Sequence, residues 1–570
     1  MAETETNDLA DKLKALAAKQ VAALDAMGKE HAQKEAGYEI KLYTCNSTGC
    51  NSGGAAEVIE AMTDAINSHG YAAKIRMVST GCMGLCGKGP LVRVEIQGQE
   101  PVMYCQVNAM IARLIAAEHI MPAIAWLEGD RKEPFTVSPY LKEHELSLKL
   151  PFFTRQHRIV LANMGRADPE NLGEYIASGG YEALRKALLT QKPADIVEEV
   201  KKSGLRGRGG GGFPTGVKWE LTAKSAGADE KFIICNGDEG DPGAYMDACI
   251  LGGGPHQVIE GMMLAAYAIG ATYGWFYIRA EYPLALARIE GAIKQCKKYG
   301  ILGKNIFGSG WDFMCDLRYG AGAFVCGEET ALMASIEGRR GTPRPRPPYP
   351  AVRGLWDKPS CINNVETLAT VPTIIRKGAD WYKTIGIEGN AGTKVFALTG
   401  HVNHSGLIEV PMGMTIREIV EEVGGGTDSG LPLKAVQTGG PSGGVIPKAL
   451  FDTQLSYEAL KKMGSMMGSG GMIVMDEKDS MVEIAKFYLG FTVDESCGKC
   501  APCRIGGYHM LKIMERIAKG KGKPEDLETL KELAFAMQKA SLCGLGQTAP
   551  NPVVSTLKHF EDEYKALIKA

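Results

Sequence analysis

The sequence predicts a mixed α/β protein made of several domains. Its 570 residues suffice for about three to five domains at roughly 100–200 residues each. In the middle of the chain, apolar runs end in polar, glycine-rich turns and are followed by helical patterns, which is typical of an open α/β sheet. Helical spacing of apolar residues marks both ends, residues 1–36 and 476–570. We therefore expect sheet-containing domains between a helical arm and a helical C-terminal domain.

Composition restricts the classes of partner. The formal net charge is −2, so no electrostatic attraction to nucleic acid or to an anionic membrane is expected. No apolar run approaches the roughly 20 residues that cross a bilayer. The first residues are acidic, whereas a secretory signal begins with basic residues and continues with apolar ones. The sequence thus predicts a cytoplasmic protein that binds no nucleic acid and does not insert into a membrane.

A first sheet domain is predicted over residues 37–125. Its expected elements follow in the order strand, helix, strand, hairpin: 38–43, 55–67, 72–78, 91–96 and 102–106. This order is thioredoxin-like. A connector rich in Pro, Glu and Lys comes next, and it predicts a linker over residues 126–150.

Eight of the fifteen cysteines form two compact groups. The N-terminal group lies on two predicted loops as Cys-x4-Cys and Cys-x3-Cys: Cys45, Cys50, Cys82 and Cys86. A redox dithiol would need Cys-x-x-Cys, whereas zinc or an iron–sulfur cluster suits the spacing. Neighbouring glycines favour the cluster, because its sulfides accept backbone N–H bonds. Zinc and an incidental grouping stay open at this point. The odd cysteine count argues against a disulfide framework.

A glycine-dense stretch at residues 204–219 predicts a ligand site. Its glycines lack a Cβ and let backbone N–H groups approach a flat or phosphorylated ligand, and its arginines and lysine add positive charge. A flexible linker is the alternative. Phe213 and Trp219 argue against a linker, because linkers rarely carry aromatic residues. We expect a flat, anionic ligand here.

Acidic and amide residues follow the predicted strands of the large domain, residues 151–392. A strand over 232–235 runs into a polar turn, and the segment 321–330 repeats this theme before a helix. These turns carry Asn236, Asp238, Glu239, Asp241, Glu328 and Glu329. Each acid alone is better explained as a helix N-cap. Together at one sheet edge they predict acceptors for ribose hydroxyls or a flavin ring. A further short strand is expected at residues 158–161.

The last third of the chain predicts two more domains. Strands and a helix over 393–475 suggest a ubiquitin-like β-grasp, in which the glycine loop 437–444 is expected to be structural. The helical residues 476–570 hold the second cysteine group: Cys497, Cys500, Cys503 and Cys543. Three cysteines at x2-x2 spacing with a remote fourth do not suit a zinc knuckle with two matched pairs. They fit a [4Fe–4S] cluster.

Four segments resemble the NADH-binding flavoprotein subunit of complex I. This subunit type also occurs in soluble NAD-linked hydrogenases, formate dehydrogenases and electron-bifurcating enzymes. The segments are GLRGRGGGGFPTGVKW (204–219), CNGDEGDPG (235–243), GEETAL (327–332) and INNVETL (362–368). The first sheet domain resembles the thioredoxin-like [2Fe–2S] ferredoxins of the same enzymes. These motifs are long and specific.

The resemblance implies roles for individual residues. It implies FMN against Gly207, Arg208, Gly209, Lys218, Asn236, Asp238, Asn363 and Asn364. It implies NAD(H) near Phe213, Lys218, Glu328, Glu329 and Tyr349, with the two glutamates orienting the nicotinamide. It also implies a [2Fe–2S] cluster on the N-terminal cysteines. Two positions depart from the family pattern: Asp241 replaces a longer Glu, and the arginine usual after Asp247 is missing.

The implied function is hydride exchange between NAD(H) and FMN, followed by one-electron transfer through the two clusters to partner subunits. The expected partners are a small [2Fe–2S] subunit and a hydrogenase, formate dehydrogenase or other iron–sulfur catalytic subunit. Ferredoxin would join them if the enzyme bifurcates electrons. The alternatives are a formate dehydrogenase diaphorase subunit, an iron–sulfur relay without flavin, and a zinc-stapled structural protein.

Overall fold

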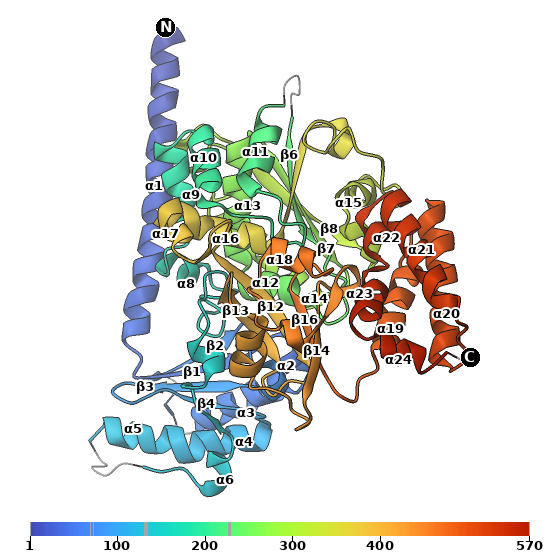
Figure 1. The fold of residues 1–570 in the computed structure, drawn as a ribbon. Coiled ribbons are helices and arrows are strands. Elements are labelled where there is room, and N and C mark those ends of the chain that lie inside the picture. Colours follow the sequence, from blue (N-terminus) through green and yellow to red (C-terminus); the bar gives the residue numbers. More distant parts are fainter. Residues whose placement is uncertain (1, 69, 72, 130–134, 226–229, 569–570) are drawn as a thin grey trace.

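The computed structural model describes residues 2–568 except 69, 72, 130–134 and 226–229. Three sheets and a C-terminal group of helices form a mixed α/β molecule, as predicted. Figure 1 shows α1 (Ala2–Ala36) along one side, the first sheet at one end and the C-terminal helices on the side opposite α1. The three sheets therefore lie between the two helical regions.

The N-terminal arm docks on the large domain. The helix α1 packs against α8 (Leu172–Ala177), and Ala17 and Leu24 are buried in this contact region. An ion pair of 2.7 Å between Asp25 and Arg185 adds to it. The arm is thus fixed to a domain that follows it by more than a hundred residues in the chain.

The first sheet has the strand order β2-β1-β3-β4-β5, with β1 and β2 parallel and the other pairs antiparallel. Its strands are β1 (Ile40–Cys45), β2 (Ile75–Thr80), β3 (Val92–Ile96), β4 (Val102–Tyr104) and β5 (Glu145–Leu146). Its helices are α2 (Thr48–Ser52), α3 (Ala55–Ser68), α4 (Ala109–Leu114), α5 (Met121–Leu127) and α6 (Pro139–Lys142). Because β5 pairs with β4, this part of the predicted linker 126–150 belongs to the sheet.

One helix corrects the expectation that no segment is apolar enough to span a membrane. The helices α4 and α5 join through a π-helical turn (Ile115–Ile120) into one helix, Ala109–Leu127, which has the length and composition of a span. Its buried residues, among them Ile111 and Ile124, lie in the same apolar cluster as the strands β1 and β3. The apolar face of this helix therefore packs against the sheet.

The large domain contains a parallel sheet with the order β8-β7-β6-β9. Its strands are β6 (Phe232–Gly237), β7 (Tyr273–Arg279), β8 (Met314–Gly320) and β9 (Ser360–Asn364). The flanking helices are α7 (Pro151–Thr154), α8, α9 (Glu182–Thr190), α10 (Pro193–Ser203), α11 (Thr215–Ala223), α12 (Met246–Gly253), α13 (Pro255–Ile269), α14 (Pro283–Lys298), α15 (Glu329–Ile336), α16 (Val365–Lys377) and α17 (Ala379–Lys383). In a parallel sheet the carboxyl ends of the strands share one edge. The polar turns after β6 and β9 therefore meet.

The strand predicted at residues 158–161 is wrong. The backbone N–H groups of Ile159, Val160 and Leu161 donate to the carboxylate of Glu409, at distances of 2.9 to 3.1 Å. Glu409 comes from β13 and is fully buried. A side chain thus satisfies the donors that a neighbouring strand would otherwise take.

The third sheet has the order β13-β12-β16-β14-β15. Its strands are β12 (Thr393–Gly400), β13 (Gly406–Pro411), β14 (Leu433–Thr438), β15 (Gly444–Pro447) and β16 (Gly471–Asp476), with a π-helical segment (Glu418–Val423) and α18 (Tyr457–Lys462) beside them. A separate pair, β10 (Gly386–Ile387) and β11 (Asn390–Ala391), precedes the sheet. These elements lie where the sequence predicts the strands and the helix of this domain.

The C-terminal helices are anchored to both preceding domains. They are α19 (Met481–Asp494), α20 (Gly507–Ala518), α21 (Asp526–Ala540), α22 (Gly544–Thr548), α23 (Asn551–His559) and α24 (Glu561–Lys565). The carboxylate of Glu495 accepts a hydrogen bond of 2.8 Å from the backbone of Phe324. The Asn551 amide donates to the carbonyl of Ser442 at 2.7 Å. These bonds place the cysteine-bearing loops next to the edge of the parallel sheet.

Candidate functional site: a carboxylate-lined cavity between two cysteine groups

A cavity of about 280 Å³ lies where three domains meet. The edge of the parallel sheet contributes the turns after β6 and β9, and the glycine-dense loop contributes Gly209. The third sheet contributes loop residues such as Gly439 and Ser469. The C-terminal helices contribute Gly544 and Leu545. This is the position at which open α/β sheets bind ligands.

Six of the predicted ligand-binding residues line this cavity: Gly209, Asn236, Asp238, Asp241, Glu328 and Asn364. The turn after β6 is held locally, because the Asn236 side chain accepts from the Asp238 backbone at 3.0 Å and donates to the Gly327 carbonyl at 2.9 Å. An ideal Cβ on Gly209 would approach Asn364 to 3.0 Å, so this position has little room for a side chain.

Two carboxylate oxygens in the cavity wall are buried without a protein partner. They are Oδ2 of Asp238 and Oε1 of Glu239, both on the turn after β6. Their other oxygens are bound: that of Asp238 lies 3.4 Å from Arg279, and that of Glu239 accepts the backbone N–H groups of Asp247 and Ala248. A buried acceptor without a donor is costly. The cavity therefore fits a ligand that brings hydroxyl or ring N–H donors, as FMN does.

Burial raises the pKa values of the cavity carboxyls. The pKa rises to about 7 for Asp238 and for Glu239 and to about 6 for Asp241, chiefly because burial disfavours the charged form. The pKa of Asp247 is raised well above its usual range for the same reason. Arg279 opposes the shift at Asp238. The cavity is thus rich in carboxyl groups that are protonated in part near neutral pH.

Two cavity residues also cap helices. Glu328 is the N-cap of α15, and its carboxylate accepts from the backbone of Thr330 and Ala331 at 2.9 and 3.0 Å. Asn364 is the N-cap of α16, and its amide donates to Asp247 at 2.6 Å. For these residues the simpler expectation of a cap holds together with a place in the cavity wall.

Seven predicted site residues do not line the cavity: Gly207, Arg208, Phe213, Lys218, Glu329, Asn363 and Tyr349. The fully buried Arg208 side chain binds the hydroxyls of Tyr382 and Tyr457 and the carbonyl of Ala391. The Lys218 ammonium donates to the Ile362 carbonyl at 3.0 Å.

The other members of this set are held or exposed nearby. Asn363 accepts from the indole N–H of Trp219, and Glu329 pairs with Arg346. Gly207 accepts at its carbonyl from the Tyr457 hydroxyl at 2.9 Å. Phe213 and Tyr349 are exposed, at 49% and 58%. Several of these residues therefore hold the loop and the strand that carry the cavity wall, and two offer free aromatic faces.

Sequence reasoning left several cavity residues out of the site. Glu239 and Asp247 line it, although only their neighbours were assigned to a ligand. The loop 437–444, expected to be structural, supplies Gly439 and Ser442 to the wall. The density of glycines in that loop was the available signal. Its distance in the chain from the other glycine-dense loop hid the relation.

The C-terminal cysteines converge as predicted. Cys497, Cys500, Cys503 and Cys543 line one small cavity. Cys543 is the N-cap of α22, and its sulfur accepts backbone N–H groups of Leu545 and Gly546. The Ser496 hydroxyl lies 3.2 Å from the Cys503 sulfur. Four thiols around one small space, with nearby donors, are a suitable donor set for an iron–sulfur cluster.

The two cavities are neighbours. Val325 and Leu545 line both of them. Val325 is buried, and Leu545 follows Cys543 by two residues. The C-terminal cysteine site is therefore separated from the carboxylate-lined cavity by apolar side chains.

The N-terminal cysteines also come together, in two pairs. The sulfurs of Cys45 and Cys50 lie 3.1 Å apart, and those of Cys82 and Cys86 lie 3.5 Å apart. Cys45 and Cys82 interact and so connect the pairs. The backbone of Gly84 donates to the Cys82 sulfur at 3.3 Å. The arrangement suits four-thiolate ligation of iron or zinc.

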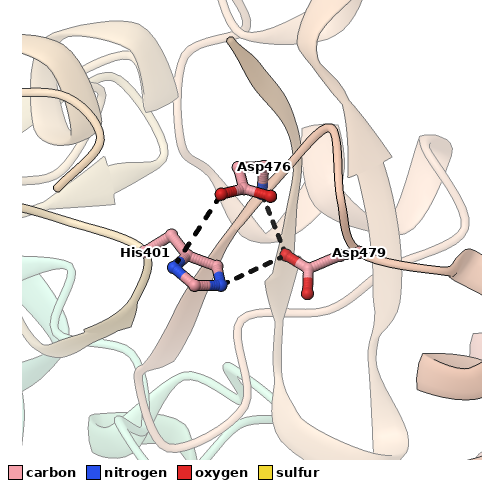
Figure 2. Close-up of side chains that lie close together, drawn as sticks. All are labelled: His401, Asp476 and Asp479. Carbon is pink, nitrogen blue, oxygen red and sulfur yellow. Dashed lines mark hydrogen bonds and ion pairs between the residues drawn. The ribbon is translucent and has the colours of Figure 1, made fainter. Parts of the chain in front are cut away.

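A third group of metal-ligating side chains lies on the third sheet and carries less weight. Figure 2 shows His401 bracketed by Asp476 and Asp479, at 3.9 Å from Nδ1 and 3.8 Å from Nε2. Asp428 also lies 3.4 Å from Nδ1. The two ring nitrogens face different carboxylates, whereas a single ion binds one of them. The geometry is that of an imidazole paired with carboxylates.

Comparison with known proteins gives three family matches. Residues 200–373 match the Nuo51 FMN-binding domain. Residues 483–567 match the iron-sulfur binding region of NADH-ubiquinone oxidoreductase-F. Residues 395–446 match the SLBB domain. The first match contains the glycine-dense loop and the sheet edge, and the second contains the C-terminal cysteines.

Individual relatives cover most of their own length. The chain is 56% identical over 412 residues to the NADP-reducing hydrogenase subunit HndC of Solidesulfovibrio fructosivorans, covering 72% of this chain and 84% of that one. It is 42% identical over 402 residues to the F-type subunit of the NADH-quinone oxidoreductase of Escherichia coli, covering 70% and 90%. A crystal structure of an NAD+-reducing [NiFe]-hydrogenase in the H2-reduced state matches 93% of this chain and 84% of that chain, with a TM-score of 0.65 and 30% identity.

These matches agree with the site that the structure assembles. The FMN-binding region forms the cavity, and the iron–sulfur region forms the neighbouring cysteine site. The relatives are oxidoreductase subunits of multi-subunit complexes. The chain belongs to the family of NADH-binding flavoprotein subunits, with FMN and [4Fe–4S] domains, of complex I and related hydrogenases.

Proposed function

We propose that the cavity between the cysteine groups holds FMN and that NAD(H) exchanges hydride with it there. The unpaired carboxylate oxygens of Asp238 and Glu239 are the observation that carries this proposal. They call for hydroxyl or ring N–H donors, and a flavin nucleotide offers both. Bound FMN supplies the conversion between a two-electron hydride and single electrons.

The chain's own residues bind and orient in this proposal. Gly209 and Gly327 leave space at the cavity wall. The exposed rings of Phe213 and Tyr349 offer faces for the nucleotide bases. Glu328 and Glu329 orient the nicotinamide, and neither moves a proton. Val325 and Leu545 exclude water between the cavity and the C-terminal cysteines.

The two cysteine groups would hold different clusters. We assign a [4Fe–4S] cluster to Cys497, Cys500, Cys503 and Cys543, next to the flavin cavity. We assign a [2Fe–2S] cluster to the N-terminal group, because its sulfurs form two close pairs and each iron of such a cluster takes two thiolates. In domain terms, this makes residues 37–125 thioredoxin-like, 151–392 a Rossmann-like FMN and NAD domain, 393–475 a β-grasp and 476–570 a helical cluster domain.

Partners are proposed on the C-terminal side. Large apolar side chains are exposed on the helical segments after Cys503 and on α21: Ile505, Tyr508 and Phe535. Such exposure is typical of protein–protein contact. The partners proposed are a small [2Fe–2S] subunit and a hydrogenase or formate dehydrogenase catalytic subunit in the cytoplasm, with ferredoxin as a further partner if electrons are bifurcated.

Quantification of FMN, iron, sulfide and zinc in the purified protein tests the proposal. We expect a yellow-brown protein that releases FMN in acid and is bleached by NADH. A brown protein without flavin would instead indicate an iron–sulfur relay, and a colourless protein with zinc would indicate a structural role. Co-purifying subunits distinguish a hydrogenase from a formate dehydrogenase. Coupled ferredoxin turnover tests bifurcation.

Glutamate roles are tested separately. We expect Glu329→Gln to slow reduction of bound FMN by NADH in stopped-flow absorbance while leaving FMN content unchanged. Glu337→Gln is a matched control, because Glu337 pairs with an arginine, Arg339, on the segment that follows α15. Equal reduction rates in wild type and Glu329→Gln would remove the orienting role.

A further inference from the structure

One helix stands between the carboxylate-lined cavity and the N-terminal cysteines. The start of α12 belongs to the cavity, because Asp247 lines it and the backbone N–H groups of Asp247 and Ala248 donate to Glu239 at 3.0 and 3.2 Å. Asp247 also accepts from Asn364 at 2.6 Å. These bonds fix the rotation of the first turn of α12.

The same turn touches the N-terminal cysteines. The Cys249 thiol interacts with the thiol of Cys82, and the Tyr245 hydroxyl interacts with that of Cys86. Cys249 and Tyr245 pack in the apolar cluster that includes Cys82. The contact is tight, since an ideal Cβ on Gly81 would lie 2.6 Å from the Cα of Gly253 at the end of α12.

The third sheet fixes the cysteine loop from another side. The backbone of Leu407 donates to the Gly84 carbonyl at 2.7 Å, and the backbone of Gly87 donates to Ser405 at 2.9 Å. The loop 82–86 is therefore held against α12 and has no room to turn its sulfurs away from Tyr245 and Cys249.

We propose that Tyr245 and Cys249 donate hydrogen bonds to the ligand sulfurs of Cys86 and Cys82 and thereby raise the reduction potential of the N-terminal cluster. Donors to ligand sulfurs stabilise the extra negative charge of the reduced state. Tyr245 and Cys249 are positioning residues and do not ligate iron. The inference rests on the proposed function, because it needs iron on the N-terminal cysteines.

One helical turn thus links the flavin cavity to the cluster ligands. From Tyr245 to Cys249 the helix rises only about 6 Å. A residue in the middle of this turn, Asp247, lines the cavity, while the residues at its ends meet the cysteines. The electrostatic setting of the N-terminal cluster is therefore set by the same helix that shapes the flavin site.

A redox titration monitored by electron paramagnetic resonance tests the inference on the full-length protein. We expect Tyr245→Phe and Cys249→Ala each to move the midpoint potential of the N-terminal cluster to a more negative value, and the double variant to move it further. Cys249→Ser keeps a donor and should lie closer to wild type. The potential of the C-terminal cluster stays unchanged in all of them.

Two matched variants serve as controls. Tyr267→Phe removes a hydroxyl that binds the Gln191 carbonyl, and Cys315→Ala removes a buried thiol of β8. Neither should move the N-terminal midpoint. The inference is overturned if Tyr245→Phe and Cys249→Ala keep the wild-type midpoint with full iron content. Loss of the cluster's iron in both Cys249→Ala and Cys249→Ser would also overturn it, because Cys249 would then be a ligand. Absence of a [2Fe–2S] signal from wild type would contradict the proposed cluster assignment itself.

Discussion

The two cysteine sites differ in how deeply the fold encloses them. In the N-terminal site Cys45, Cys50 and Cys82 are buried, and the loop 82–86 is covered by α12 and β13. In the C-terminal site Cys497 and Cys500 are partly exposed. Only Val325 and Leu545 are common to the linings of that site and of the carboxylate-lined cavity, among the described residues.

This difference separates two jobs. A half-exposed site beside the flavin cavity, with exposed apolar side chains on neighbouring helices, suits electron transfer to another subunit. A site enclosed by three domains suits a cluster whose potential the protein sets through contacts. Four experiments can break or sharpen this comparison.

The largest effect is expected from removing a ligand of the exposed site. Cys543→Ala should abolish the [4Fe–4S] signal, because the fourth thiolate is lost, while NADH still bleaches the flavin. Electron paramagnetic resonance, iron content and stopped-flow absorbance measure these outcomes. The control is Cys315→Ala, a buried thiol outside both groups. A full [4Fe–4S] signal in Cys543→Ala would contradict the ligand assignment.

The next effect concerns the enclosure of the N-terminal site. An ideal Cβ on Gly406 would lie 1.9 Å from the Gly84 carbonyl and 2.9 Å from the Cys86 nitrogen. Gly406→Ala should therefore push the cysteine loop off β13, destabilise the protein by about 1–3 kcal/mol and lower the N-terminal cluster content. Melting temperature and iron content measure this. Gly291→Ala, with no atom within 4 Å of the added Cβ, should do neither. Unchanged melting of Gly406→Ala would show that the loop is not fixed by β13.

A smaller effect concerns pH and the cavity between the sites. The raised pKa of Asp238, about 7, lies above the roughly 4 of an unfolded carboxyl. The folded, flavin-free protein therefore binds extra protons between these values, and this stabilisation is lost as pH rises through about 7. Between pH 6 and pH 8 we expect the free energy of unfolding to fall by about 1 kcal/mol through this group.

Thermal melting of flavin-free protein at both pH values measures this change. Asp238→Asn should reduce the difference, and Glu388→Gln, at an exposed position, should leave it unchanged. An identical pH dependence in Asp238→Asn and wild type would show that Asp238 is not the titrating group.

The smallest effect concerns the wall between cavity and cysteines. Leu545→Ala shortens a partly exposed side chain common to both linings, so we expect a loss of only about 1 kcal/mol in stability. Water admitted at this wall should shift the midpoint potential of the C-terminal cluster but not of the N-terminal one. A redox titration compares the two. Equal shifts at both sites would argue against their separate environments.

Local patterns predicted much of this structure. Period-two runs located β12 and β13, and polar turns located the ends of β6 and β9. Cysteine spacing predicted that each group of four converges, and the structure brings both groups together. These signals work because the relevant residues are close in sequence or share a loop.

What the sequence could not predict depends on contacts between distant segments. The run 158–161 is apolar enough for a strand, yet its N–H groups bind Glu409, some 250 residues away. Arg208 has the charge of a ligand-binding residue, yet Tyr382 and Tyr457 take up its guanidinium. The role of the loop 437–444 as a cavity wall arises only when the third sheet docks on the parallel one.

The place of Cys543 in the chain has a consequence for how the protein is made. It follows the parallel sheet, the third sheet and the three other cysteines of its group in the sequence. The ribosome must therefore synthesise all of these before the fourth sulfur exists. Insertion of iron at that end has to wait for them, whereas the N-terminal sulfurs are all available before the first strand of the parallel sheet has been made.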